Sequence, residues 1–314
     1  MTIAAPLRHD ALLYSSEQEF LDQALPFVRD GLANAEPVLV VSTEANLATL
    51  EQALGDESDA VTYVPAGGWY CHPAHTIARY RRALDERLDE GAARVRVIGE
   101  VQFGEAEPEQ RDWVRYEAAL NRAFASAPVW ILCPYDLRAL PAPVSRSAVE
   151  THPHVLRGGQ RSPNAAYTAP EHVAQRLGTA PSLGRDEAPA AAFDVAGTVA
   201  PVRAGLRALA AKVGMSRERT EELTVAVNEA VTNALLHGRP PVRVELFTAD
   251  TTLECAVTDA GATGPDPLAG FTPPPAADEP QGGMGLWLAR QLCERVELLQ
   301  TGAGTAVLLT VRLR

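Results

Sequence analysis

The stretch Glu222-Leu-Thr-Val-Ala-Val-Asn-Glu229-Ala-Val-Thr-Asn233-Ala-Leu-Leu-His237-Gly238 decides the fold of the C-terminal part of this 314-residue chain. On a helix, Glu229 and Asn233 are four residues apart and share one face. Apolar residues flank that face, namely Leu223, Ala226, Val227, Ala230, Val231 and Ala234. A carboxylate and a carboxamide one turn apart can order a water and coordinate Mg²⁺, which prefers oxygen ligands. The alternative interpretation is an amphipathic helix whose polar edge is merely solvated.

Three later segments, in a fixed order, favour the first interpretation. Leu253-Glu-Cys-Ala-Val-Thr-Asp259-Ala-Gly261 predicts a strand that runs into an acid, with a glycine two residues later. Gln281-Gly282-Gly283-Met284-Gly285-Leu286-Trp287 places a glycine cluster before an apolar helix, 286–292. Glycines at a helix start let backbone N–H groups approach phosphate, and the helix dipole favours the anion. Gly304-Thr305-Ala-Val-Leu-Leu-Thr-Val-Arg predicts a terminal strand.

With these four blocks, residues 193–314 resemble the GHKL ATPase superfamily, and in particular the anti-sigma-factor kinases of the RsbW and SpoIIAB type. The resemblance implies an α/β-sandwich (Bergerat) ATPase domain that binds ATP and Mg²⁺. By position in the motifs, it implies that Asn233 holds Mg²⁺ and that Glu229 is the general base, which suits a carboxylate one turn away. It also implies that Asp259 accepts a hydrogen bond from the adenine amino group.

The remaining family roles fall on the glycine blocks and on the segment between them. Gly261 is expected to let the adenine approach, and Thr305 to face it. Three residues are expected to lie along the phosphates: Gly283, Met284 and Gly285. Thr263 stands where the family's second block has its second glycine. The aperiodic segment 263–281, which contains three consecutive prolines, is interpreted as a lid over the nucleotide.

Composition excludes several classes of protein. The formal net charge is −12 and the sequence pI is about 5.1, which disfavours a nucleic-acid binder because phosphate contacts need clustered lysine and arginine. No signal peptide is indicated at the N-terminus, and no apolar run approaches the roughly 18 residues of a membrane span. The four cysteines are widely separated, without a CxxC pair. We therefore expect a cytoplasmic protein with reduced thiols.

The N-terminal half alternates helices and strands, which predicts a doubly wound α/β domain. Helices are expected over residues 19–32, 45–54, 74–91 and 111–125, with Pro26 as a kink in the first. Strands are expected over residues 37–42, 61–64, 95–98 and 129–133. Ligands of open α/β sheets bind beyond the carboxyl ends of strands. Those ends carry Ser42-Thr43, Gly99-Glu100 and Cys133-Pro-Tyr135-Asp136, and no Walker lysine is present.

Three features of this half resemble the MEDS (DcmR-type sensory) domain: His9-x-x-x-x-Tyr14, the Phe-Val-x-x-Gly-Leu end of the first helix, and the Pro-Val-Leu-Val-Val strand. The resemblance implies a degenerate RecA-like module that senses a small organic molecule. The candidate sensory residues are His9, Tyr14, Glu100, Cys133 and Tyr135. The plainer interpretations are a histidine that caps a strand for His9 and a buried structural cysteine for Cys133.

Two histidine-rich stretches raise the question of a metal site. They are Cys71-His72-x-x-His75 and His152-x-His154. Such residues bind zinc when they converge. The spacing does not show convergence, and Pro73 and Pro153 indicate ordinary turns. We therefore favour turns over a metal site.

The expected organisation is a sensory domain over residues 1–161, a linker over 162–192 and an ATPase domain over 193–314. The resemblance implies a serine/threonine kinase that phosphorylates an anti-anti-sigma (STAS-type) partner or sequesters a sigma factor. One alternative is a sensor histidine kinase, but the segment 197–213 is a single short helix without a phosphoacceptor histidine. Another is a nucleotide-binding, sigma-binding module without catalysis. Leu206, Leu209 and Val213 share one helix face, which predicts either a homodimer interface or a core contact.

Overall fold

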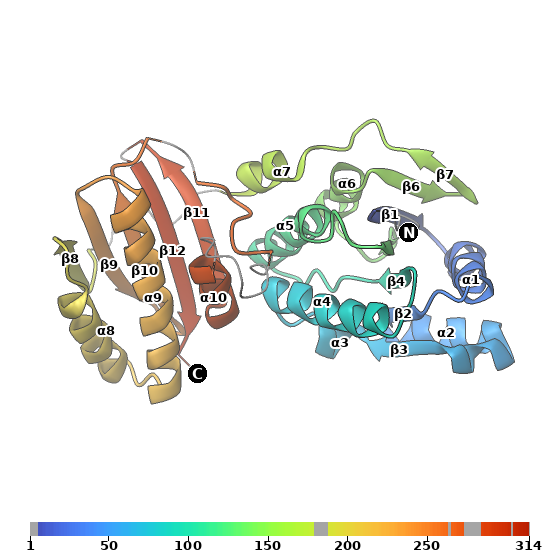
Figure 1. The fold of residues 1–314 in the computed structure, drawn as a ribbon, viewed down its shortest axis with the longest axis horizontal. Coiled ribbons are helices and arrows are strands. Elements are labelled where there is room, and N and C mark those ends of the chain that lie inside the picture. The colour runs from blue at the N-terminus through green and yellow to red at the C-terminus, as the bar shows by residue number, and fades with distance from the viewer. Residues whose placement is uncertain (1–5, 179–187, 263–264, 273–283, 303, 314) are drawn as a thin grey trace. The chain divides into compact units, whose positions relative to one another are not determined.

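The computed structural model describes residues 6–178, 188–262, 265–272, 284–302 and 304–313. The chain divides into two compact units, Met1–Ala174 and Gln175–Arg314 (Figure 1). The division falls inside the segment 162–192 that we interpret as a linker. That segment also contains helix α7 (Pro170–Leu177), whose Val173 and Ala174 are fully buried.

The first unit is built on a seven-stranded sheet in the order β3-β2-β4-β5-β1-β6-β7. Its strands are β1 (Arg8–Tyr14), β2 (Val38–Ser42), β3 (Val61–Pro65), β4 (Val95–Gly99), β5 (Val129–Asp136), β6 (His154–Arg157) and β7 (Gln160–Pro163). Neighbouring strands are parallel except for β7, which runs antiparallel to β6. Because the central strands are covered on both faces, they are continuous apolar runs rather than alternating ones.

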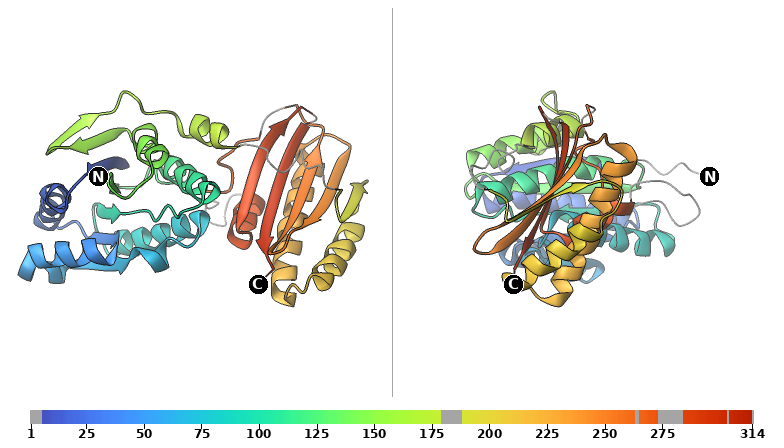
Figure 2. Two further views of the ribbon diagram at one scale, coloured as in Figure 1. Left: turned by 180° about the vertical axis from the view of Figure 1, so that it is seen from behind. Right: turned by 90° about the vertical axis from the view of Figure 1, so that its left-hand side faces the viewer.

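Helices cover both faces of this sheet, as a doubly wound fold requires (Figure 2). They are α1 (Glu17–Ala33), α2 (Glu44–Leu54), the one-turn α3 (Ala66–Trp69), α4 (Pro73–Asp89), α5 (Glu107–Ala123) and α6 (Ala142–Thr151). Helices α1 and α2 pack together, and α5 packs between α4 and α6. Tyr14 of β1 contacts Phe20 of α1, whereas His9 bonds to Asn121 of α5. Successive residues of a strand point to opposite faces, so the two residues, five positions apart, face different helix layers.

The predicted elements of this unit are present, with ends shifted by a few residues, and several were missed. Pro26 lies inside a continuous α1. Pro73 begins α4 rather than a turn, since the first helical position needs no N–H donor. Strands β1, β6 and β7 and helices α3 and α6 were not predicted. Helix α6 begins Ala-Pro after Pro141, and this run of prolines conceals it in the sequence.

The second unit is a two-layer α/β sandwich, as the sequence predicts. Its antiparallel sheet has the order β11-β12-β10-β9-β8, formed by β8 (Ala191–Val195), β9 (Val242–Thr248), β10 (Thr252–Asp259), β11 (Arg295–Thr301) and β12 (Gly304–Arg312). One face carries α8 (Ala200–Lys212), α9 (Arg217–His237) and α10 (Met284–Leu292) (Figure 1). Their apolar residues and the inward residues of the strands form one core.

Helix α9 is the predicted amphipathic helix, extended by one turn at its N-terminus. The Ser216 side chain caps it by accepting from the Arg219 N–H at 3.2 Å. All six predicted flanking apolar residues are buried, while Glu229 and Asn233 are half-buried at the edge of the stripe. Helix α8 buries Val202, Leu206 and Ala210 in the same core. Of the predicted face, Leu206 is buried in this core, and Leu209 and Val213 pack against it but stay partly exposed.

Only residues 265–272 of the predicted lid lie within the described residues. This stretch packs against α10: the buried Arg290 donates to the carbonyls of Ala269 at 2.8 Å and Pro267 at 3.3 Å. The guanidinium also lies 4.0 Å from the centre of the Phe271 ring. No helix within the described ranges combines the length and apolarity needed to cross a membrane.

Candidate functional site

A pocket of about 510 Å³ opens between α9 and the ends of β10 and β12. Asn233, Ala230 and His237 of α9 line one side, while Asp259 of β10 and Thr305 of β12 line another. Ala234, Val257, Leu286, Leu298 and Val307 give the pocket an apolar interior. A largely apolar cavity with a few convergent polar groups is typical of a small-molecule site.

Asp259 is the best-defined polar group of this pocket. Its Oδ1 accepts two backbone hydrogen bonds, from Gly261 N at 2.7 Å and from Arg239 N at 3.1 Å. These bonds fix the carboxylate, which is 9% exposed. Oδ2 accepts no hydrogen bond from the described residues, so it is left to accept one from a ligand.

Three glycines allow the backbone to close around Asp259. A Cβ at Gly238 would lie 2.5 Å from Asp259 Cγ, and one at Gly261 would lie 2.6 Å from Asp259 Oδ1. Gly304, with a φ of +140°, would press a Cβ into the Asp259 carbonyl. Gly304 precedes Thr305, which pairs with Asp259 across β10 and β12. At each of these positions a side chain would collide with Asp259, so only glycine lets the backbone pass this close.

Glu229 and Gly285 meet at the start of α10. A Cβ on Gly285 would collide with the Glu229 carboxylate and lie 3.2 Å from Glu229 Cβ, so α10 begins directly against this side chain. Asn233, one turn further along α9, lines the pocket. Met284 is 54% exposed at the same helix end, and Gly283 lies outside the described residues. Arg239 and Gly238 were not predicted as site residues. Each contacts Asp259 through its backbone, and the sequence motifs do not show such a contact.

Known proteins are similar in sequence to this part of the chain. A family model described as "Histidine kinase-like ATPase domain" matches residues 192–311. Serine-protein kinase RsbW of Bacillus velezensis is 32% identical over 122 residues, covering 35% of this chain and 74% of the relative. The chain belongs to the RsbW family. RsbW proteins of Bacillus pumilus and Bacillus subtilis are each 30% identical over 122 residues, with 75% and 74% of their lengths covered. The RsbW-like domain of this chain is thus a GHKL-type ATPase domain.

The other unit has a family of its own. A model described as "MEDS: MEthanogen/methylotroph, DcmR Sensory domain" matches residues 8–153. The chain therefore joins a MEDS domain to an RsbW-like ATPase domain, as the sequence motifs predict.

The sensory candidates of the MEDS domain fall into two separate groups. Tyr14 and Glu100 form the first, where the Tyr14 hydroxyl donates to Glu100 Oε1 at 3.1 Å. Glu100 Oε2 accepts from Asn46 Nδ2 at 2.9 Å, from the Thr43 N–H at 3.2 Å and from the Ser42 hydroxyl. Burial raises the pKa of Tyr14 and the Glu100 charge adds to the rise, so the phenol stays a donor. The group ties the ends of β1, β2 and β4 together.

His9, Cys133 and Tyr135 belong to the second group, on the opposite face of the sheet. Cys133 Sγ is 3.3 Å from His9 Nε2, and Tyr135 stacks edge-on against His152 at 5.7 Å between ring centres. Glu117 of α5 joins them, with Oε2 3.2 Å from His9 Nε2 and 3.4 Å from His152 Nε2. Glu117 could not be found from sequence, and His152 lies with His9 rather than with the histidines at 72 and 75. Among the described residues, Cys71, His72 and His75 do not join it.

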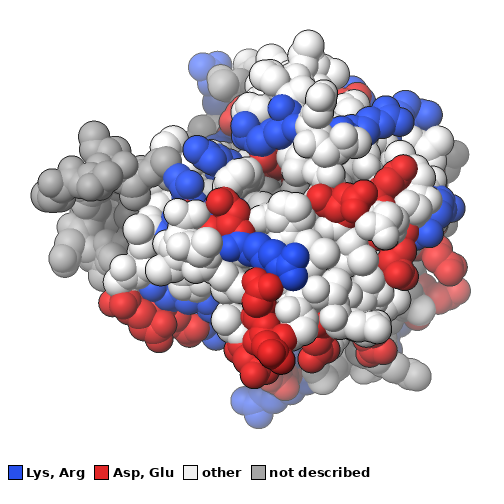
Figure 3. All heavy atoms as spheres, turned by 90° about the vertical axis from the view of Figure 1, so that its right-hand side faces the viewer, with Lys and Arg blue, Asp and Glu red and all other residues white. Residues whose placement is uncertain are grey.

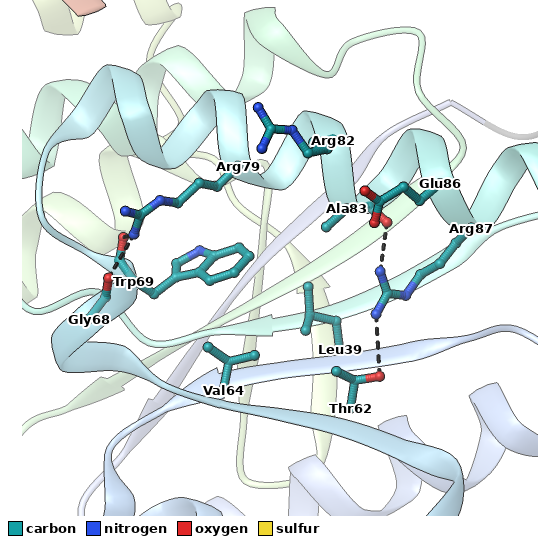
Figure 4. A pocket seen from close by; sticks show the side chains of 10 residues that line it. All are labelled: Leu39, Thr62, Val64, Gly68, Trp69, Arg79, Arg82, Ala83, Glu86 and Arg87. Atoms are coloured by element: carbon teal, nitrogen blue, oxygen red, sulfur yellow. Dashed lines mark hydrogen bonds between the residues drawn. The ribbon is translucent and has the colours of Figure 1, made fainter.

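A further pocket of the MEDS domain, of about 560 Å³, contains none of the predicted residues (Figure 4). Leu39, Val64 and Trp69 line it beneath helix α4, which contributes Arg79, Arg82 and Arg87 at its rim. Arg79 is held by the carbonyls of Gly68 at 2.7 Å and Trp69 at 3.1 Å. Helix α4 also contributes Glu86, and Arg87 donates to the Ala83 carbonyl at 2.8 Å and to Thr62 Oγ1 at 3.3 Å, so the rim carries charges of both signs.

Surface charge agrees with the acidic composition. On the face drawn in Figure 3, arginine and acidic side chains are interspersed rather than gathered into one basic patch.

Proposed function

We propose that this protein is an ATP- and Mg²⁺-dependent serine/threonine kinase that regulates a sigma factor, and that its MEDS domain adjusts the kinase in response to a small ligand. The observation that carries the proposal is the pocket around Asp259, whose free carboxylate oxygen lies among apolar side chains within an RsbW-like domain. It suits the exocyclic amino group of adenine, a donor on a flat apolar ring.

The residues around the pocket suit an adenine nucleotide and its metal. Asp259, Gly261 and Thr305 would hold the base, and the N-terminus of α10 at Met284 and Gly285 would face the phosphates. Asn233 would supply an oxygen ligand to Mg²⁺. Bound in this way, ATP·Mg²⁺ supplies a γ-phosphoryl group whose charge the metal partly neutralises.

Glu229 is the proposed general base. Its position one helical turn before Asn233, against the start of α10, places a carboxylate beside the proposed phosphate region. In that role it takes the proton from the attacking hydroxyl of a protein serine or threonine. The proposed substrate is an anti-anti-sigma protein of the STAS type, and the sigma factor is the competing partner.

The proposed sensory control needs a ligand that favours one state of the ATPase domain over another, because a ligand with equal affinity for both states shifts nothing. The arginine-rimmed pocket of Figure 4 is a candidate place for that ligand.

A sensor histidine kinase and a nucleotide-binding module without catalysis are the competing functions. The experiment below separates both from the proposal.

The test compares transfer of labelled γ-phosphate to a cognate STAS-type partner by the full chain and by Glu229→Ala. Loss of a general base is expected to slow transfer by about 10²–10⁴-fold. Binding of ATP, measured on the same preparations, is expected to survive. Glu218→Ala, at an exposed glutamate in the first turn of the same helix, is the matched control and should transfer phosphate normally.

Equal rates for Glu229→Ala and the unchanged chain would remove Glu229 as the base. Label that appears as acid-labile phosphate on the chain itself would favour the histidine kinase. ATP binding without transfer to any partner would favour the binding module.

A further inference from the structure

Four side chains that can all bind a metal ion meet in the interior of the MEDS domain. They come from four places in the fold: His9 from β1, Glu117 from α5, Cys133 from β5 and His152 from the residue that ends α6. All four are buried, at 0–2% exposure. One ligand atom from each lies within 4.8 Å of every other.

The spacing of these atoms is close to that of a tetrahedral zinc shell. Glu117 Oε2 is 3.2 Å from His9 Nε2 and 3.4 Å from His152 Nε2, and His9 Nε2 is 3.3 Å from Cys133 Sγ. Zinc bonds of about 2.0–2.3 Å at tetrahedral angles place neighbouring ligand atoms about 3.3–3.6 Å apart. The other three separations lie within 4.8 Å, so an ion at the centre needs the four side chains to draw together by about 1 Å.

In each histidine, Nδ1 faces a hydrogen-bond acceptor outside the cluster, so Nε2 points toward the centre of the cluster. His152 Nδ1 lies 2.8 Å from the Ala148 carbonyl, which can only accept, so Nδ1 carries the proton. His9 Nδ1 lies 3.1 Å from Asn121 Oδ1. The Asn121 amide is oriented by its Nδ2, which donates to the Thr151 carbonyl at 2.7 Å. Each imidazole therefore turns its Nε2 inward, which is the usual outer arrangement around metal-bound histidine.

Glu117 brings a buried carboxylate into the centre of the cluster. The carboxylate oxygens of Glu117 and Nε2 of His152 have no hydrogen bond of normal geometry within the described residues, and the two histidines are the only ion-pair partners of Glu117 there. A buried carboxylate is costly unless it is paired and hydrogen-bonded. A divalent ion with two neutral imidazoles, one carboxylate and one thiolate has a net charge of zero, which removes that cost.

We propose that His9, Glu117, Cys133 and His152 form a closed tetrahedral site for a divalent transition-metal ion of the zinc class. Two imidazoles, a thiolate and one carboxylate oxygen favour zinc over Mg²⁺ or Ca²⁺, which take oxygen ligands in larger shells. Four protein ligands leave no open position, so the ion is structural: it clamps two strands to the α5 and α6 layer. Because the site is closed, the ion enters as the domain folds.

The test measures metal in the full chain, purified without a histidine tag, by elemental analysis and by cobalt substitution. We expect one equivalent of metal per chain and, with Co²⁺, the absorption of a cobalt–thiolate bond. Cys133→Ser should lose that absorption. Cys71→Ser, the same change at an exposed cysteine, is the matched control and should retain it. Asn121→Ala removes the outer hydrogen bond to His9 together with the bonds from Asn121 to the carbonyls of Thr151 and Glu117, and it leaves all four proposed ligands in place. It should weaken zinc affinity by about 10–100-fold in a chelator competition.

Circular dichroism of each variant separates lost metal from lost folding, and Asn121→Ala keeps the test decisive if the ligand variants fail to fold. The proposal is overturned if the folded, unchanged chain binds neither zinc nor cobalt stoichiometrically. It is also overturned if Cys133→Ser keeps the cobalt–thiolate absorption, because the thiolate ligand would then be another cysteine. Unchanged zinc affinity in Asn121→Ala counts against the proposed orientation of His9 and hence against this site.

Discussion

At the scale of single residues, the backbone packs so closely around the key side chains of the proposed site that almost no space is left beside them. Asp259 is held by two N–H groups and enclosed by glycines, and Gly285 brings α10 against Glu229. That the motif positions Asn233, Asp259 and Thr305 lie together could be predicted from sequence, since all three line one pocket. The reason for each glycine could not be predicted from sequence, because a contact with Asp259 or Glu229 depends on segments far apart in the chain.

Gly285→Ala is the sharpest change at this scale. Its methyl group must displace the Glu229 carboxylate or push α10 away, and overpacking of this kind costs about 1–3 kcal/mol. We expect weaker nucleotide binding and slower phosphate transfer, measured by titration and by the labelled transfer assay. Gly302→Ala, where the added Cβ meets nothing within 4 Å, is the control. Equal effects of the two substitutions would contradict the proposed packing of α10 on Glu229.

Whole elements were predicted well where the apolar pattern was long and poorly where it was short. Helix α9 was predicted from its stripe of six apolar residues, β10 from its alternation, and β12 from the glycine and threonine at its start. Strand β1 was missed although it carries both His9 and Tyr14. As a result, the sensory candidates were treated as one set, whereas the period of two residues in a strand sends them to opposite faces of the sheet.

Helix α8 supplies a test of the core at this scale. Leu206 is fully buried against α9 and the sheet, so Leu206→Ala is expected to cost about 2–5 kcal/mol in stability of the ATPase domain. Leu236→Ala makes the same change at a leucine that is 71% exposed, and should cost no more than about 0.5 kcal/mol. Hydrogen exchange of peptides from α9 and β9, followed across a denaturant series, reports on this domain alone. Comparable losses at the two positions would show that α8 does not pack as described.

The whole molecule is a chain of two units with different architectures, one parallel and doubly wound, the other an antiparallel sandwich. The motifs predicted both folds, and the family matches at residues 8–153 and 192–311 agree. The buried cluster of His9, Glu117, Cys133 and His152 could not be predicted from sequence, because its members are separated by up to 143 residues and no spacing rule links them. Only the fold brings β1, α5, β5 and the end of α6 together.

The measurement that tests the central claim most directly is a calorimetric titration of the full chain with ATP and ADP in the presence of Mg²⁺. The pocket around Asp259 predicts binding of one nucleotide per chain, together with a loss of affinity of about tenfold or more in Asp259→Asn, because a buried hydrogen bond to a charged group is worth about 1.5–3 kcal/mol. Absence of heat from either nucleotide at millimolar concentration with the folded chain would contradict the account.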